Sequence, residues 1–161
     1  MKKIAVFVDV QNIYYTVKKQ FGCYFNYRGL WRQLSEQGQI LEASAYAIER
    51  NDAGQRGFQQ VLREIGFEVK LKPFIQRSDG SAKGDWDVGI AIDIMDCAGS
   101  ANPPDEIVLL SGDGDFDLLL ARVGQRYKIT TSVYGVAALT AASLIDAADH
   151  FQPIQARLLL K

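Results

Sequence analysis

Three aspartates stand on alternate residues directly after a short apolar run. Asp113, Asp115 and Asp117 follow residues 107–110, and a fourth acid, Asp9, follows a similar run at residues 4–8. Clustered carboxylates repel one another unless water, basic side chains or a cation screens them. Hard oxygen ligands suit Mg²⁺ or Mn²⁺, and one histidine and two cysteines leave little for a zinc site. The pattern therefore favours a divalent cation held by carboxylates.

The same aspartates have a simpler interpretation as helix caps. Asp is favoured at N-caps and in first turns, so for any one of them capping is about as good an explanation as metal binding. The group of three together with Asp9 favours the metal. Asn12 is either a cap or a polar group that orients Asp9 or a water molecule on the metal. A calcium loop is excluded, because its glycine position is Leu118 and its final acid position is Gly124.

Short apolar runs alternate with helical patterns and predict the elements that position these acids. Strands are expected at residues 4–8, 40–48, 67–74, 107–110 and 127–134, the third of them near a sheet edge. Helices are expected at residues 10–20, 26–38, 51–65, 85–96, 116–123 and 139–148, the fifth ended by Gly124. This alternation predicts a three-layer α/β/α sandwich with a mainly parallel central sheet of about five strands. Ligands of such sheets bind beyond the carboxyl ends of the strands. Two of the expected strands are followed by aspartates at that end.

The helix expected near Asp85, with that residue as its N-cap, carries two further acids. Asp87 falls in the first turn, where the helix dipole favours an ionised carboxylate that can face the crevice. Asp93 lies six residues on, about 120° around the helix axis, so the two cannot share one metal and Asp87 is the expected ligand. The polar stretch before this helix, residues 77–84, resembles a lid. Its Lys83 is either a phosphate-binding group or a solvated lysine.

Composition fits one compact domain over residues 1–161. The chain is 48% hydrophobic with a net charge of −1, which argues against a sequence-independent nucleic-acid coat protein. A nuclease is still allowed, since it needs basic groups only along the phosphate path. Cys23 and Cys97 form no paired motif, which fits a reducing compartment. With no signal peptide or membrane span evident, we expect a cytoplasmic protein.

The segment between residues 9 and 38 is both aromatic and basic. It contains Tyr14, Tyr15, Tyr24, Tyr27, Arg28, Trp31 and Arg32. Aromatic rings beside cations are typical of a path for single-stranded nucleic acid, but they are also ordinary core material. Neither the dinucleotide glycine fingerprint nor a phosphate loop is present, so no nucleotide cofactor is expected. The tail at residues 156–161 either packs on its own domain or exchanges with a second copy, which leaves a homodimer open.

Three motifs occur in order along the chain. They are Phe7-Val8-Asp9-x-x-Asn12, then Lys83-Gly84-Asp85-Trp86-Asp87-Val88 followed by Ile92-Asp93, and Ser111-Gly112-Asp113-Gly114-Asp115-Phe116. Together they resemble the NYN domain, the LabA-like branch of the PIN-like nuclease superfamily. The resemblance covers almost the whole chain and implies a PIN-like, Rossmann-like fold. It also implies an endoribonuclease that uses Mg²⁺ or Mn²⁺ to cleave RNA.

The resemblance carries over residue by residue. It implies that Asp9, Asp87 and Asp113 bind the metal, with Asp115 as a fourth acid and Asn12 as a supporting polar group. Apart from the resemblance, we expect Asn12, Ser111 and Lys83 to contact the substrate. Two departures from the family pattern are evident. Asp85 and Trp86 separate Lys83-Gly84 from Asp87, where related sequences often have one residue, so Asp85 competes with Asp87 for the metal. Asp117 stands where an apolar residue is common.

Two other functions are compatible with the same acids. A domain that binds RNA or a protein without cutting would use them for a structural ion or for none. A small-molecule phosphohydrolase ranks last, because the dehalogenase type needs a second acid two residues after Asp9, where this chain has Gln11.

Overall fold

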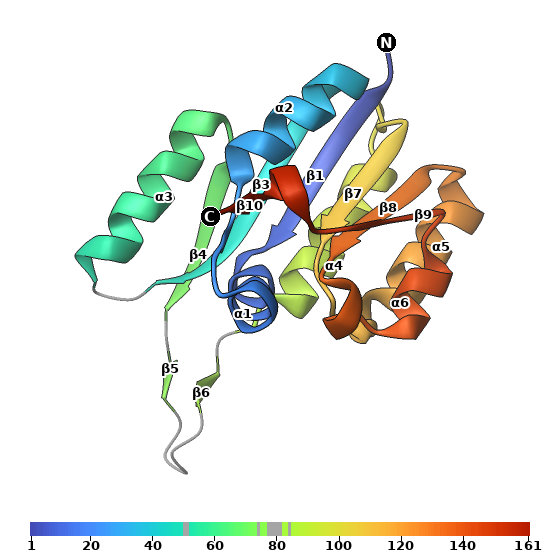
Figure 1. Ribbon diagram of the computed structural model, residues 1–161. Helices are drawn as coiled ribbons and strands as arrows, with labels where there is room; N and C mark the ends of the chain where they lie inside the picture. Colours follow the sequence, from blue (N-terminus) through green and yellow to red (C-terminus); the bar gives the residue numbers. More distant parts are fainter. Residues whose placement is uncertain (50–51, 74, 77–81, 84) are drawn as a thin grey trace.

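A parallel β-sheet forms the centre of the molecule. The computed structural model describes residues 1–49, 52–73, 75–76, 82–83 and 85–161. Within them, the central sheet has six strands in the order β4-β3-β1-β7-β8-β9, and every neighbouring pair is parallel (Figure 1). The strands are β1 (Lys3–Asp9), β3 (Gln39–Glu49), β4 (Glu68–Pro73), β7 (Glu106–Leu110), β8 (Thr130–Gly135) and β9 (His150–Pro153). The expected edge position of β4 is confirmed.

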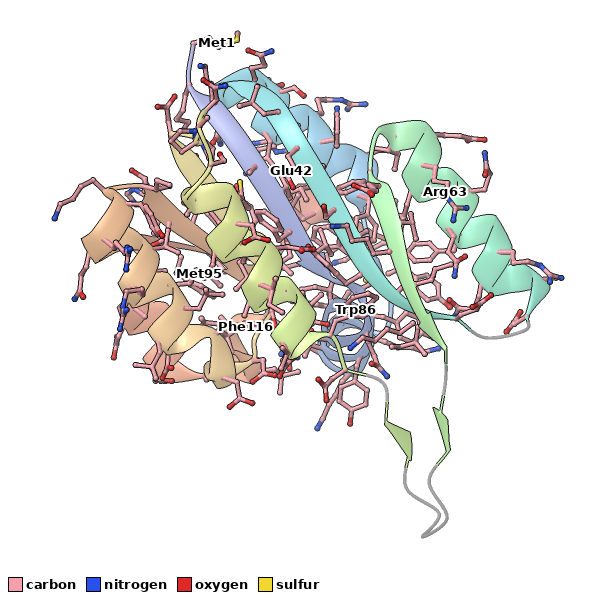
Figure 2. The ribbon with its side chains drawn as sticks, turned by 180° about the vertical axis from the view of Figure 1, so that it is seen from behind. Met1, Glu42, Arg63, Trp86, Met95 and Phe116 are labelled. Carbon is pink, nitrogen blue, oxygen red and sulfur yellow. The ribbon has the colours of Figure 1, made fainter. Side chains whose placement is uncertain are left out.

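Helices cover both faces of this sheet. One face carries α1 (Val10–Phe21), α2 (Tyr27–Gln37) and α3 (Ala53–Ile65), and the other carries α4 (Asp87–Ala98), α5 (Asp117–Tyr127) and α6 (Ala142–Ala147), as seen from the two sides in Figures 1 and 2. Ile4, Val6 and Val8 pack into the core under α1 to α3, while Ala5 and Phe7 pack into the core under α4 to α6. This alternation along β1 follows from the twofold period of a strand. The predicted three-layer α/β/α sandwich is confirmed.

Several helices begin directly after a capping residue that is recognisable in the sequence. Asp9 caps α1, Asn26 caps α2 and Asp52 caps α3, each by accepting a hydrogen bond from a backbone N–H near the start of its helix. Helix α1 ends at Gly22, whose φ of 67° lies in the left-handed region that glycine adopts without strain.

Three details differ from the sequence-based expectations. The sheet has a sixth strand, β9, whose four residues alternate in exposure and form no apolar run that would identify it. Helix α5 continues past Gly124 to Tyr127, since an internal glycine costs a helix only about 1 kcal/mol, and β8 therefore begins at Thr130 and not at the expected residue 127. The last helix is shorter than expected, because residues Ala137–Leu139 form a separate 3₁₀ turn before α6.

Two short ladders complete the described structure. The C-terminal β10 (Leu159–Leu160) pairs antiparallel with β2 (Tyr24–Phe25), so the tail packs on its own chain (Figure 1). The ladder of β5 (Ile75–Gln76) and β6 (Ala82–Lys83) is also antiparallel. Most of the stretch that resembles a lid, residues 77–81 and 84, lies outside the described residues. Among the described helices, none combines the length and the apolar character that crossing a bilayer requires.

Candidate metal centre

The acids gather where the sheet order reverses. On one side of β1 the sheet continues with β3 and then β4, which forms one edge. On the other side it continues with β7, β8 and β9, which forms the other edge. Asp9 ends β1, and Asp113 follows three residues after the end of β7. Helix α4 begins at the same end of the sheet, with Trp86 beside its first turn in Figure 2. In open α/β sheets this reversal point is where ligands bind.

Three carboxylates meet at this point. Asp87, Asp113 and Asp115 each offer an oxygen, and these oxygens all lie within 4.8 Å of one another. They come from two segments, the first turn of α4 and the loop after β7. Asp113 also caps the 3₁₀ helix Gly114–Phe116, because its Oδ1 accepts a hydrogen bond from the N–H of Asp115 at 2.9 Å. The Asp113 carboxylate therefore both caps this 3₁₀ helix and belongs to the group of three acids.

Asp9 lies outside that group of three but is tied to it. Its side chain is buried, with 8% of the residue exposed. Its Oδ2 accepts a hydrogen bond from Ser111 Oγ at 3.2 Å, and Ser111 Oγ accepts one from the N–H of Asp113 at 3.1 Å. Ser111 therefore links the carboxylate at the end of β1 to the backbone of the loop after β7.

Asn12 joins the same two segments. Its Oδ1 accepts a hydrogen bond from the N–H of Gly112 at 2.9 Å, and its own N–H donates to Asp9 Oδ1 at 3.4 Å. Asp9, not Asn12, is the cap of α1. Of the two interpretations that the sequence leaves open, the cap is therefore wrong, and the orienting role of Asn12 stays a prediction.

We expect Asn12→Ala to lower the free energy of unfolding by about 1–3 kcal/mol, because the N–H of Gly112 loses its acceptor. We also expect the affinity for Mn²⁺ to fall roughly tenfold to a hundredfold, as is typical for groups that orient metal ligands. Urea unfolding and a calorimetric titration with Mn²⁺ measure the two effects. Asp149→Ala is the matched control, because Asp149 accepts a hydrogen bond from the N–H of Thr131 in β8. An equal loss of Mn²⁺ affinity in both variants would show that Asn12 acts through stability alone.

Burial and crowding raise the pKa of two of these carboxyl groups. Burial is the main cause that raises the pKa of Asp87 to about 7, and a hydrogen bond with Asp113 and the charges of Asp113, Asp85 and Asp9 add to it. Burial likewise raises the pKa of Asp9 to about 6 despite two opposing hydrogen bonds. The described ion pairs, Lys2–Glu106 and Lys70–Asp93, involve none of these four acids. A bound cation would relieve this accumulation of negative charge.

The raised pKa values predict that the metal-free protein loses stability as pH rises. An aspartate in the unfolded chain titrates near its ordinary pKa of 3.8, whereas Asp9 and Asp87 keep their protons to about pH 6 and 7. Between about pH 4 and 7 the folded state binds more protons, so the free energy of unfolding falls with pH. In EDTA we expect a Tm roughly 5 °C higher at pH 5 than at pH 8. Asp87→Asn should remove the larger part of that difference, because Asp87 keeps its proton to a higher pH than Asp9 does. An unchanged slope in this variant would contradict the assignment.

The other acids near the cluster take separate roles. Asp85 is not the N-cap of α4. Trp86 holds that position without a side-chain cap, and Asp85 Oδ1 instead accepts a hydrogen bond from the N–H of Asp87 at 3.3 Å. Asp117 Oδ1 accepts one from the N–H of Leu118 at 2.6 Å. Neither acid belongs to the group of three. Lys83 falls in β6, and its side chain lies outside the part that the structure describes.

Asp93 faces a different partner, in agreement with its expected position on the helix. Its Oδ2 accepts hydrogen bonds from Tyr46 Oη and Lys70 Nζ, both at 2.7 Å. Nearby, Trp86 Nε1 donates to the carbonyl of Ala47 at 2.8 Å. These contacts hold the start of α4 against β3 and β4 and so position Asp87. No local sequence signal identifies them, because the partners are 23 to 47 residues apart in the chain.

Similarity to known proteins extends over nearly the whole chain. The family model of the NYN domain matches residues 3–155. Low amplitude and bright protein LabA from Synechococcus elongatus (strain ATCC 33912 / PCC 7942 / FACHB-805) is 30% identical over 159 residues, covering 92% of this chain and 82% of LabA. The crystal structure of VPA0982, a protein of unknown function from Vibrio parahaemolyticus RIMD 2210633, is 50% identical with a TM-score of 0.91, covering 99% of this chain and 96% of that one. The sandwich described above is thus shared with VPA0982.

Proposed function

The chain belongs to the NYN domain family, and on this premise we propose that it is a ribonuclease that hydrolyses RNA phosphodiester bonds with Mg²⁺ or Mn²⁺. The observation that carries this proposal is the group of Asp87, Asp113 and Asp115, whose carboxylate oxygens lie within 4.8 Å of one another at the reversal point of the sheet. Carboxylate clusters of this kind suit hard divalent cations.

The donor set fits the proposed ion. All three groups are oxygen ligands, and the pKa of Asp87, raised to about 7 by burial and by its acidic neighbours, reflects negative charge that a cation would offset. We assign Asp87, Asp113 and Asp115 as metal ligands, with Asp9 as a fourth acid behind them. A proton on Asp87 competes with the cation, so cleavage should increase as pH rises from 6 to 8.

Each residue then has a defined part in the reaction. When bound, a divalent ion at such a site lowers the pKa of the attacking water and stabilises the leaving oxygen. Ser111 and Asn12 hold the loop that carries Asp113 against the end of β1, which fixes the spacing of the ligands. Lys83, on β6, is proposed to bind the phosphate.

A cleavage assay tests the proposal. Purified protein is incubated with an end-labelled single-stranded RNA and MnCl₂, with EDTA, the DNA of the same sequence and p-nitrophenyl phosphate as comparisons. We expect RNA fragments only when metal is present, and internal cuts would identify an endonuclease. RNA binding without metal-dependent cleavage would overturn the proposal in favour of a non-catalytic module. Hydrolysis of the phosphate ester alone would overturn it in favour of a small-molecule phosphohydrolase.

A further inference from the structure

An aromatic cavity of about 650 Å³ opens beside the start of α1, the helix that follows Asp9. Its lining starts at Val10 and Gln11, the two residues after Asp9, and continues over β2, the end of β3 and the start of α3. Figure 1 places α1, which supplies one wall, at the carboxyl end of β1. Six lining residues are aromatic: Tyr14, Tyr15, Tyr24, Phe25, Tyr27 and Phe58. A ligand in this cavity would lie next to the strand end that carries Asp9.

The rings divide into a buried floor and an exposed rim. Phe25 and Tyr27 are buried in the core under α1 to α3. Tyr14, Tyr15 and Tyr24, here called the tyrosine rim, are 48%, 63% and 54% exposed. The rings of Tyr14 and Tyr24 stack with their centroids 6.1 Å apart and an angle of 26° between their planes. Packing does not require three large rings in solvent, so a cluster of this kind indicates a binding surface.

Two lysines make the tyrosine rim basic. Lys18 Nζ lies 5.6 Å from the ring centroid of Tyr14 and 5.7 Å from that of Tyr24, and Lys19 Nζ lies 5.9 Å from that of Tyr15. Neither lysine forms an ion pair within the described part of the chain. Their charges are therefore available to an anionic ligand whose flat groups stack on the rings.

We infer that the tyrosine rim is a stacking site for unpaired bases of the RNA strand whose phosphodiester is cut at the neighbouring acids. This inference rests on the proposed ribonuclease function and adds that the enzyme selects single strands. Aromatic rings interleaved with cations bind single-stranded nucleic acid of any sequence, since every base offers a flat face. The bases of a duplex are stacked on one another and cannot reach such rings.

Fluorescence anisotropy tests the inference with a labelled 12-nucleotide oligouridylate and a blunt RNA duplex. The buffer contains Ca²⁺, and gels verify that the RNA stays intact. Stacking is worth about 1–3 kcal/mol per base, so the Tyr14→Ala/Tyr24→Ala variant should bind the single strand roughly tenfold to a hundredfold more weakly. The matched Tyr14→Phe/Tyr24→Phe variant keeps both rings and should bind like the original protein. Circular dichroism and Tm verify that both variants fold.

The outcomes separate this inference from the proposed function. Unchanged affinity in the alanine variant, equal affinity for single strand and duplex, or no RNA binding at all would each overturn the stacking site, even if the enzyme cleaves RNA. Binding that depends on the rings without any cleavage in Mn²⁺ would support the stacking site and contradict the ribonuclease. A dimer that dissociates on Tyr15→Ala and binds no RNA would overturn the inference and identify the tyrosine rim as a contact between two copies of the chain.

Discussion

Replacing Asp113 by Asn is expected to reduce metal-dependent RNA cleavage by roughly 10²–10⁴-fold, because the metal supplies several kcal/mol of transition-state stabilisation and each 1.4 kcal/mol corresponds to a factor of ten. Asp113 contacts both parts of the proposed site. It lies with Asp87 and Asp115 in the group of three, and its backbone is linked through Ser111 to Asp9. The amide of Asn keeps an oxygen that can still cap the 3₁₀ helix, so the fold should persist.

Asp117→Asn is the matched control for this variant. Asp117 stands four residues further along the same segment and lies outside the group of three, with its Oδ1 bonded to the N–H of Leu118. Asparagine preserves that acceptor, so activity should stay within about twofold. Initial cleavage rates at saturating Mn²⁺ and melting curves of both variants provide the comparison. Full activity in the Asp113 variant would eliminate the proposed ribonuclease site.

Addition of Mn²⁺ or Mg²⁺ is expected to raise the Tm of the protein by roughly 5–10 °C when the ion is present at about a hundred times its Kd. A ligand at that concentration adds about 2.7 kcal/mol to the free energy of unfolding, and a chain of this size gains about 2–4 °C per kcal/mol. The increase should be larger at pH 8 than at pH 6, because the pKa of Asp87 is raised to about 7 and its proton competes with the cation.

The same two variants identify where the ion binds. Asp113→Asn should abolish most of the increase in Tm, whereas Asp117→Asn should retain it. Thermal scans with increasing MnCl₂, each paired with an EDTA sample, measure the effect. An equal increase in both variants would mean that the ion binds elsewhere and would remove the support that the carboxylate cluster gives to the proposed function.

Several features of the site follow from local sequence patterns. The apolar runs that become β1 and β7 end in Asp9 and in the loop of Asp113, and the carboxyl ends of neighbouring parallel strands lie at one edge of a sheet. The position of Asp87 in the first turn of α4 also follows from its place before an apolar helix. Each of these properties depends on residues close together in the chain, and the sequence determines them by itself.

Tertiary packing decided which of these side chains meet and which of them are exposed. Asp85 and Asp87 are the same residue type two positions apart, and only the placement of α4, held by Tyr46, Lys70 and Trp86, brings Asp87 to the other acids. The same holds for the tyrosine rim, where burial separates Tyr27 from Tyr14 although both belong to the aromatic and basic segment between residues 9 and 38. The physical reason is that the direction and exposure of a side chain depend on contacts with residues far away in the chain. Local pattern determines which elements form and where acids stand on them, and packing determines which of those side chains meet.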